Sequence, residues 1–333
     1  MKIGIFGGTF DPPHLGHQTA AEAAIKSLNL DLLLFIPTGL PPHKSQDANG
    51  ASPEQRFEMT AILADSLHAK VSNVELNRAG KSYTADTIEE LCMQYPDDEL
   101  WLIVGADMFL SLQTWHEPER IFKHVGIAAF AREKENDERA FAAQAQKLDT
   151  KYGVQLIENP NMVEISSSEI RRKLAENEDI SHVLLQPVYG YILRHALYGT
   201  QLDLKCLDDE KLRAVSYSML KAKRLAHVRG TEETAVKLAA HWGENVNNAR
   251  RAAILHDCTK YWEPTEQLAL CKRYGVILDE LETQGAKFLH AKTGALLARH
   301  LFGEPDAVYD AIFCHTTGKP NMTRLDQILY LAD

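Results

Sequence analysis

The chain has 333 residues and is long enough for two domains, because single hydrophobic cores usually stop growing near ~250–300 residues. Its 45% hydrophobic and 25% charged residues are ordinary for a globular protein, and the net charge of −10 argues against a nucleic-acid partner but leaves room for small anionic nucleotides. The five scattered cysteines, the lack of a signal sequence and the lack of any apolar run near ~20 residues lead us to expect a cytoplasmic protein with no disulfide framework and no membrane partner.

The first seventeen residues carry the most informative pattern. Residues 1–6 predict a short buried strand, followed by the turn Gly-Gly-Thr-Phe-Asp-Pro-Pro-His-Leu-Gly-His at 7–17 and then by an Ala-rich helix. The N-terminus of a helix offers free N–H groups to a phosphate, and His14 and His17 would add imidazole donors there. A plain glycine turn with a polar helix cap is the simpler alternative.

Strand and helix patterns then alternate up to about residue 195. We expect strands at 32–36, 71–76, 99–104, 125–130 and 154–157, with helices at 53–67 and 84–95. This alternation predicts an α/β fold with a doubly wound parallel sheet. Ligands bind such sheets beyond the carboxyl ends of the strands.

Two further strings in this region could bind phosphate. Lys44 follows a proline-stiffened segment at 40–43, where it is either a phosphate ligand or a solvated lysine. The string Ile-Ser-Ser-Ser-Glu-Ile-Arg at 165–171 predicts the capped start of a helix, in which Arg171 lies one turn in. The serines are either a cap alone or part of an anion site.

Together these strings resemble the nucleotidylyltransferase superfamily, and the double proline before His14 is most similar to the bacterial nicotinate-nucleotide adenylyltransferases. Ser168 stands where that family usually has Thr, a change that keeps the hydroxyl. The resemblance implies transfer of AMP from ATP to nicotinate mononucleotide with release of pyrophosphate, a step of NAD biosynthesis assisted by Mg²⁺. It implies that His14, His17, Lys44 and Arg171 stabilise charge on the phosphates.

The resemblance also implies the binding residues. Those for ATP would be Gly8, Thr9, Phe10, His14, His17, Gly105, Asp107, Ser167, Ser168 and Arg171. Those for nicotinate mononucleotide would be Lys44, Thr84 and Trp115. Trp115 is either a stacking face for the pyridine ring or core filler, and Asp107 would hold either a ribose hydroxyl or Mg²⁺. The preference for nicotinate over nicotinamide stays open.

From residue 208 onward the periodicity is helical throughout. We expect helices at 226–242, 246–260, 264–274, 286–301, 305–314 and 323–331. The sequence therefore predicts a first domain at 1–198, a linker at 199–207 and an all-α bundle at 208–333.

Histidines and aspartates in the bundle form a candidate metal set: His227, His256, Asp257, His290, His315 and Asp333. Imidazole and carboxylate ligands suit Fe, Mn, Co or Zn, and residues on different helices can converge inside a bundle. Each histidine alone is more easily explained as structural. The His256–Asp257 pair in an apolar run is the sharper signal, because a buried acid needs a partner or a metal.

This series resembles the HD superfamily of metal-dependent phosphohydrolases, in particular the YqeK-type branch, which cleaves diadenosine tetraphosphate into two ADP with iron. The resemblance implies one metal on His227, His256, Asp257 and Asp333, and a second on His290 and His315 with Asp257 bridging. Such metals lower the pKa of water and generate the attacking hydroxide. Lys260 would stabilise a phosphate oxyanion, unless it is merely solvated.

Relatives of that branch continue beyond the position of Asp333, so we expect a trimmed or truncated chain whose last ligand is poorly held. Two alternatives remain at this stage. The bundle could act on another nucleotide, as the first domain could on another mononucleotide, or it could be a non-catalytic nucleotide sensor. The oligomeric state and the coupling between the two sites stay open.

Overall fold

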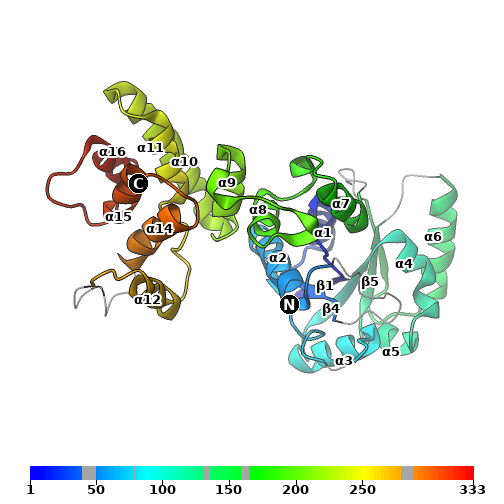
Figure 1. Cartoon of the computed structure of the whole chain (residues 1–333). Helices are drawn as coiled ribbons and strands as arrows, with labels where there is room; N and C mark the ends of the chain where they lie inside the picture. Colours follow the sequence, from blue (N-terminus) through cyan, green and yellow to red (C-terminus); the bar gives the residue numbers. More distant parts are fainter. Residues whose placement is uncertain (40–49, 79, 131–134, 159–164, 279–281, 283–287) are drawn as a thin grey trace. The chain divides into compact units, whose positions relative to one another are not determined.

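The computed structural model describes residues 1–39, 50–78, 80–130, 135–158, 165–278, 282 and 288–333. The chain divides into two compact units, Met1–Leu185 and Gln186–Asp333 (Figure 1). Each unit has hydrophobic core of its own. No helix of the described residues is both long enough and apolar enough to span a bilayer.

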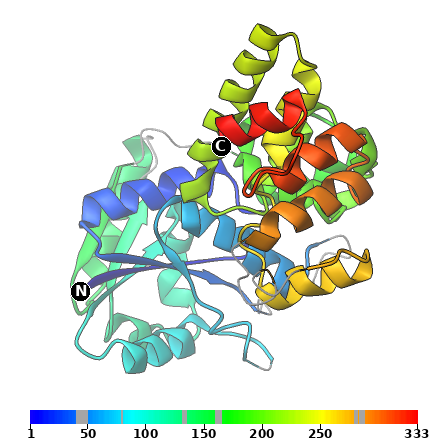
Figure 2. The ribbon, with the colours of Figure 1, turned by 90° about the vertical axis from the view of Figure 1, so that its left-hand side faces the viewer.

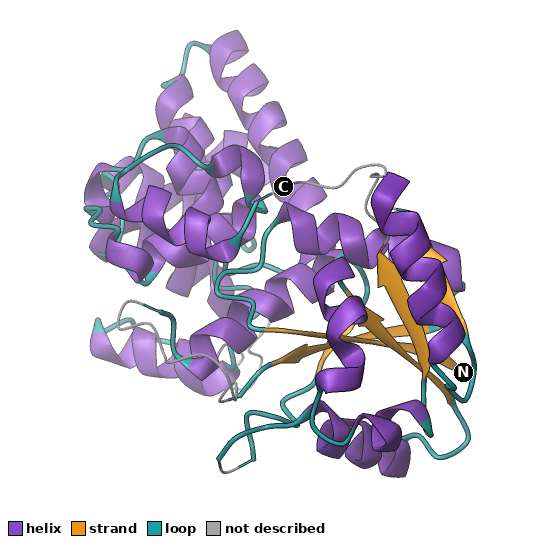
Figure 3. Ribbon diagram, turned by 90° about the vertical axis from the view of Figure 1, so that its right-hand side faces the viewer, coloured by secondary structure: helices purple, strands orange, loops and turns teal. Residues whose placement is uncertain are grey.

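The first unit is built on a six-stranded sheet in which every neighbouring pair of strands is parallel (Figure 3). The strand order is β3-β2-β1-β4-β5-β6. The strands are β1 (Lys2–Gly8), β2 (Leu32–Pro37), β3 (Lys70–Val71), β4 (Glu99–Val104), β5 (Gly126–Phe130) and β6 (Val154–Ile157). The predicted doubly wound parallel sheet is confirmed.

Helices cover both faces of the sheet, because successive side chains of a strand point to opposite sides. On β4, Leu102 belongs to one core and Ile103 to the other. The first core is shared with α3 (Thr84–Gln94), α4 (Ala106–Ser111), α5 (Pro118–Phe122) and α6 (Glu135–Lys147). The second is shared with α1 (Leu15–Leu28) and α2 (Pro53–Ser66).

The strand order reverses between β1 and β4, the two central strands. At such a reversal the loops leaving the two strands lead to opposite faces of the sheet and open a crevice beyond their carboxyl ends. The turn after β1 contains His14, and the turn after β4 contains Gly105 and Asp107. The topology therefore brings two predicted parts of a site to one edge of the sheet.

The strand expected at 71–76 is wrong in length, because β3 covers only Lys70–Val71. Its last ladder bond runs from the Ser72 N–H to the Phe35 carbonyl, 2.9 Å away. The chain then forms a turn closed by Asn77 N–H and the carbonyl of Asn73. Val74 and Glu75 are both buried beyond the strand, so the apolar pattern there reflects a packed turn.

All secondary structure described in the second unit is helical, and Figure 2 shows these helices in the colours from green to red. They are α8 (Gln186–Arg194), α9 (Asp209–Tyr217), α10 (Ala222–Trp242), α11 (Val246–Leu255), α12 (Pro264–Arg273), α14 (Leu289–His300), α15 (Asp306–Cys314) and α16 (Arg324–Ala332). The predicted helix at 246–260 is too long at its end. After Leu255 the backbone tightens into turns, with Cys258 N–H bonded to the Leu255 carbonyl.

Helix α8 packs within the second unit, although the sequence analysis placed it in the first domain. Gly190 explains the contact, since a Cβ there would lie 1.8 Å from the Ala214 carbonyl oxygen of α9. The two helix backbones touch at this point, which only glycine permits. The compact units thus divide between Leu185 and Gln186.

Candidate active sites

The turn after β1 holds His14 and His17 at the start of α1. His14 is the N-cap, with an extended backbone, and His17 is the third residue of the helix. The backbone N–H of His14 donates to Nδ1 of His17 at 3.2 Å, and the two ring centroids are 3.8 Å apart. Because Nδ1 of His17 accepts this bond, its ring proton belongs on Nε2, where it can be donated to a ligand.

Burial keeps both imidazoles neutral at neutral pH. It lowers the pKa of His14 to about 4, and His14 is only 7% exposed. The pKa of His17 is held well below its usual range, chiefly by burial and to a smaller extent by electrostatic repulsion from His14. Nδ1 of His14 is buried, and among the described residues it has no hydrogen-bond partner. A buried polar atom of this kind is unusual in a finished core and typical of a site that awaits a ligand.

Phe10 packs its side chain between the turn and β2 and stabilises the turn. Its side chain is 1% exposed, and its ring lies 5.0 Å from that of His17 and 5.6 Å from that of Phe35. Its φ of 50° is in the left-handed region, which turns the chain sharply after Gly8. A Cβ on Gly8 would lie 2.9 Å from the Phe10 ring. The Phe10 side chain therefore supports His17, and only its backbone is left for a nucleotide.

The start of α7 (Ser167–Ala175) meets this turn directly. The Ser167 hydroxyl donates to the Pro12 carbonyl at 2.9 Å, and Arg171 donates to the Asp11 carbonyl at 2.7 Å. Ser166, not Ser168, caps the helix by accepting from Glu169 N–H. Ser168 is exposed in the same first turn. The predicted phosphate-binding strings at 7–17 and 165–171 thus lie together. Their contact brings two helix N-termini and the Arg171 guanidinium to the turn that carries the imidazoles.

Four other residues predicted to bind the nucleotides lie at α3, at α4 and in the segment that follows α4. Gly105 caps α4, and a Cβ there would meet no atom of the described residues within 4 Å. Asp107 is exposed in the first turn of α4. Thr84 begins α3 and is half-buried, while Trp115 packs its ring partly against the core. Lys44 lies outside the described residues. The binding roles of all five stay predictions.

Sequence reasoning missed Arg56 on α2. Its side chain is 4% exposed and donates to the carbonyls of Thr9 and Gly39, at 2.8 and 3.3 Å. These bonds join the loop after β1 to the start of the loop after β2. No signal in the sequence separates this arginine from an ordinary charged residue of an amphipathic helix, because its partners are backbone carbonyls.

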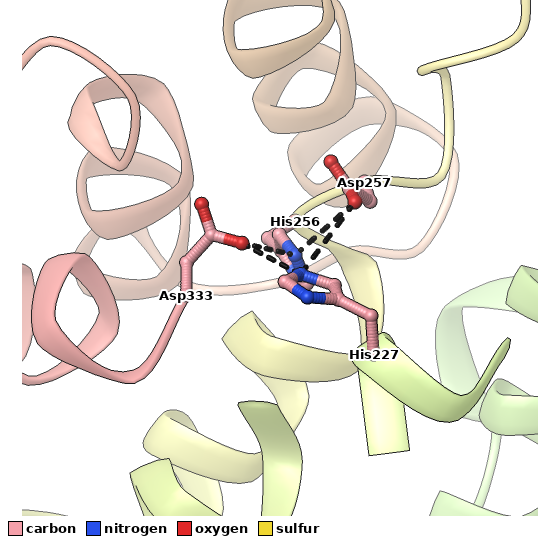
Figure 4. Close-up of side chains that lie close together, drawn as sticks. All are labelled: His227, His256, Asp257 and Asp333. Carbon is pink, nitrogen blue, oxygen red and sulfur yellow. Dashed lines mark hydrogen bonds and ion pairs between the residues drawn. The ribbon is translucent and has the colours of Figure 1, made fainter. Parts of the chain in front are cut away.

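The second unit brings all six predicted metal ligands together. One group contains His227, His256, Asp257 and Asp333, and another contains Asp257, His290 and His315, with the donor atoms of each group within 4.8 Å of one another. Asp257 is shared by both. Figure 4 shows the first group: Asp333 Oδ1 lies 2.7 Å from His227 Nε2 and 3.2 Å from His256 Nε2.

Backbone contacts orient the rings of the cluster. Nδ1 of His256 lies 2.6 Å from the Ala253 carbonyl, and Nδ1 of His315 lies 2.6 Å from the Ile312 carbonyl. A carbonyl can only accept, so Nδ1 carries a proton in both rings, and in a neutral ring Nε2 then keeps its lone pair. Nε2 of His315 is buried, and no group in the described part of the chain bonds to it. An oriented, unpartnered lone pair beside a shared carboxylate fits a metal ligand.

The charges of the cluster are strongly coupled. Burial alone would lower the pKa of His256, but hydrogen bonds and charge from Asp257 and Asp333 raise it to about 9. Burial would raise the pKa of Asp257, yet its contacts with His256 and His290 hold it well below its usual range. Burial lowers the pKa of His315 to about 3. At neutral pH Asp257 is therefore charged and His315 is neutral, and these are the states in which a carboxyl and an imidazole bind a metal.

Two cations also reach Asp257. Lys260, which the sequence analysis singled out, lies 3.0 Å from Oδ1, and Arg224, which it missed, pairs with Oδ2. The other arm of Arg224 lies 3.6 Å from Asp333 Oδ1. The sequence did contain a signal for Arg224. It precedes His227 by three residues on α10, and residues at this spacing share one face of a helix.

The comparisons with known proteins agree with this architecture. The chain matches the model of the cytidylyltransferase-like family over residues 5–173 and that of the HD domain over residues 224–333. The chain therefore belongs to the cytidylyltransferase-like family and carries an HD domain behind the family region.

Individual relatives are similar to the first part of the chain. A "Probable nicotinate-nucleotide adenylyltransferase" of Exiguobacterium sibiricum is 38% identical over 201 residues, which cover 60% of this chain and 100% of the relative. One of Carboxydothermus hydrogenoformans is 41% identical, covering 59% and 98%. The first part of the chain thus groups with proteins named as nicotinate-nucleotide adenylyltransferases.

Among solved structures, a Clostridium acetobutylicum protein described as a "predicted HD superfamily hydrolase involved in NAD metabolism" is 33% identical, covering 38% of this chain and 67% of that one. The TM-score between the two structures is 0.37.

Proposed function

We propose that the first unit transfers the adenylyl group of ATP to nicotinate mononucleotide and forms nicotinate adenine dinucleotide and pyrophosphate. The observation that carries this proposal is the junction of His14, His17 and Arg171, which lie on two helix starts joined through Asp11 and Pro12. The named relatives support the choice of substrates.

In this reaction an oxygen of the mononucleotide 5′-phosphate forms a bond to the α-phosphorus of ATP. The bond from that phosphorus to the bridging oxygen breaks, and pyrophosphate leaves with the electron pair. No protein nucleophile is needed, because positioning and charge neutralisation carry such transfers. We assign His14 and His17 to the reacting phosphate, and Lys44 and Arg171 to the β- and γ-phosphates. Mg²⁺, when bound, would help to neutralise the charge of the phosphates.

The other predicted residues would complete this pocket. ATP would lie against Gly8, Thr9, the backbone of Phe10, Gly105, Asp107, Ser167 and Ser168, while Thr84 and Trp115 would receive the pyridine nucleotide. Backbone N–H groups at the starts of α1 and α7 would supply donors that cost no side-chain entropy.

Steady-state assays of the full chain test this proposal. ATP and Mg²⁺ should give pyrophosphate and a dinucleotide with nicotinate mononucleotide, and less product with the nicotinamide form. If neither pyridine mononucleotide is adenylylated while another phosphate acceptor is, the substrate assignment is wrong.

We propose further that the second unit is a metal-dependent phosphohydrolase that cleaves diadenosine tetraphosphate into two ADP. The convergence of six ligands on a shared, fully buried Asp257 supports a two-metal site. His227, His256, Asp257 and Asp333 would hold one metal, and Asp257, His290 and His315 the other, with iron the expected element. When bound, the metals would supply Lewis acidity and a water of lowered pKa. Lys260 would meet a phosphate oxygen.

Metal analysis and product analysis separate this proposal from its rivals. We expect two transition-metal ions per chain and ADP as the main product, both reduced in His256→Ala. Hydrolysis of a different nucleotide would change the substrate class only. Metal binding without hydrolysis of any nucleotide would favour a sensor. Two further predictions remain: that the first functional domain ends at residue 198 and the second begins at residue 208, and that the protein is cytoplasmic.

A further inference from the structure

We infer that Arg224 couples metal binding to phosphate binding in the second unit. The inference rests on the proposed metal site and concerns a residue outside the predicted ligand set. Its guanidinium pairs with Oδ2 of Asp257 and lies 3.6 Å from Oδ1 of Asp333. Both carboxylates belong to the ligand groups of that site.

The contact places a cation on an oxygen that a metal needs. Asp257 has a side-chain exposure of 0%, so a charge partner must accompany its carboxylate whether or not metal is present. Lys260 covers Oδ1 and Arg224 covers Oδ2. A metal ion that binds Oδ2 must therefore displace the guanidinium, and the displaced cation then faces like charge.

An oxyanion relieves this conflict. Arg224 is 22% exposed at its side chain and lies on α10 one turn before His227, so its planar fork can leave Asp257 without leaving the site. Arginine forks bind phosphate oxygens by two parallel bonds. A bound metal ion displaces Arg224 from Asp257, and a bound phosphate gives the displaced guanidinium a new partner. Each ligand therefore lowers the cost of binding the other, which is thermodynamic coupling.

The network around Arg224 limits where the guanidinium can go. Thr231 occupies the other side of His227, with its hydroxyl 3.3 Å from Nε2. Lys260 already occupies the second oxygen of Asp257. The guanidinium also reaches Asp333, whose side chain is 21% exposed, so this side of the cluster is open to solvent. A phosphate that approaches the metals from that side would meet the guanidinium first.

Calorimetric titration of the full chain with Mn²⁺, with and without inorganic phosphate, tests the inference. In the wild type, saturating phosphate should raise Mn²⁺ affinity about tenfold. Arg224→Gln should bind Mn²⁺ more tightly than wild type in the absence of phosphate, and phosphate should then add less than about threefold. Lys223→Gln removes the same charge from an exposed neighbour on the same helix and should behave as wild type.

Arg224→Lys keeps the charge but loses the fork and should give intermediate coupling; it decides the matter if the glutamine variant is unfolded by circular dichroism. Equal coupling in wild type and either folded variant would overturn the inference. If the wild type binds no Mn²⁺, the metal site itself is wrong and the inference falls with it. If coupling follows Arg224 but no nucleotide is hydrolysed, only the proposed hydrolase function fails.

Discussion

Arg171 donates a hydrogen bond of 2.7 Å to the main-chain carbonyl of Asp11, which lies 160 residues earlier in the chain. A second nitrogen-to-oxygen approach, 3.7 Å from the Asp11 carboxylate, keeps the guanidinium beside the turn. The contact fixes the start of α7 to the loop that leads into α1. Arg171 thus joins these two segments, and under the proposed function it would also donate to a phosphate of ATP.

Replacement of Arg171 by lysine should separate these two roles. Lysine keeps the charge but cannot hold Asp11 and a phosphate with one planar group. We expect the KM for ATP to rise about tenfold, with a smaller loss in kcat. The control is Arg172→Lys, since Arg172 is the exposed neighbour that pairs with Glu176. Indistinguishable KM values for ATP in the two variants would contradict the assignment.

Removal of the His17 imidazole should cost transition-state stabilisation. In His17→Ala we expect turnover to fall by about a hundredfold or more, on the order of 3 kcal/mol. Circular dichroism should show an intact fold. His182→Ala, at an exposed histidine, should keep full turnover. Near-normal turnover in the His17 variant would remove this residue from the mechanism.

The buried His14 predicts a pH dependence of stability. Burial lowers its pKa from 6.5 to about 4, so between these values the unfolded chain binds the proton and the folded chain does not. The contribution of His14 is complete above pH 6.5 and is lost as the pH falls toward 4. His14→Asn should show a shallower fall in the free energy of unfolding over this window, by up to about 3 kcal/mol at its lower end. Denaturant unfolding at a series of pH values measures the difference, and parallel curves would count against it.

Loss of one imidazole should remove one metal. His315 belongs only to the group it forms with Asp257 and His290, whereas His227 and Asp333 belong to the other. His315→Ala should therefore retain about one metal ion per chain where the wild type retains two. Elemental analysis after dialysis gives the count, with His300→Ala, an exposed histidine on α14, as the control. Two retained ions would show that His315 is not a ligand.

Arg56 should matter for stability as well as for the site. Arg56→Met would leave the carbonyls of Thr9 and Gly39 without their guanidinium donor, and each unsatisfied buried group costs about 1–3 kcal/mol. We expect a lower free energy of unfolding in urea and a raised KM for ATP. Arg139→Met, at an exposed position of α6, should change neither. Unchanged stability in the Arg56 variant would show that water replaces the lost bonds.

Local sequence patterns were enough to predict the fold class and most of the candidate residues. Alternating strand and helix periods predicted the parallel sheet, because a buried strand and an amphipathic helix have different repeats. The turn at 7–17 and the histidine and aspartate series pointed to their sites because few other roles need those residue types in that order. Such signals are local, and one chain segment carries each of them.

Which segments meet could not be predicted in this way, because it depends on contacts made in the folded chain. The Arg171–Asp11 contact, the buried Arg56 and the Arg224–Asp257 pair join residues that are far apart in the chain, and their partners include backbone carbonyls that leave no mark on the sequence. Phe10 likewise proved to be a support for His17, because burial depends on what packs above a side chain. The end of β3 and the tight turn after α11 were missed for the same reason: hydrogen bonds made in three dimensions override the local pattern.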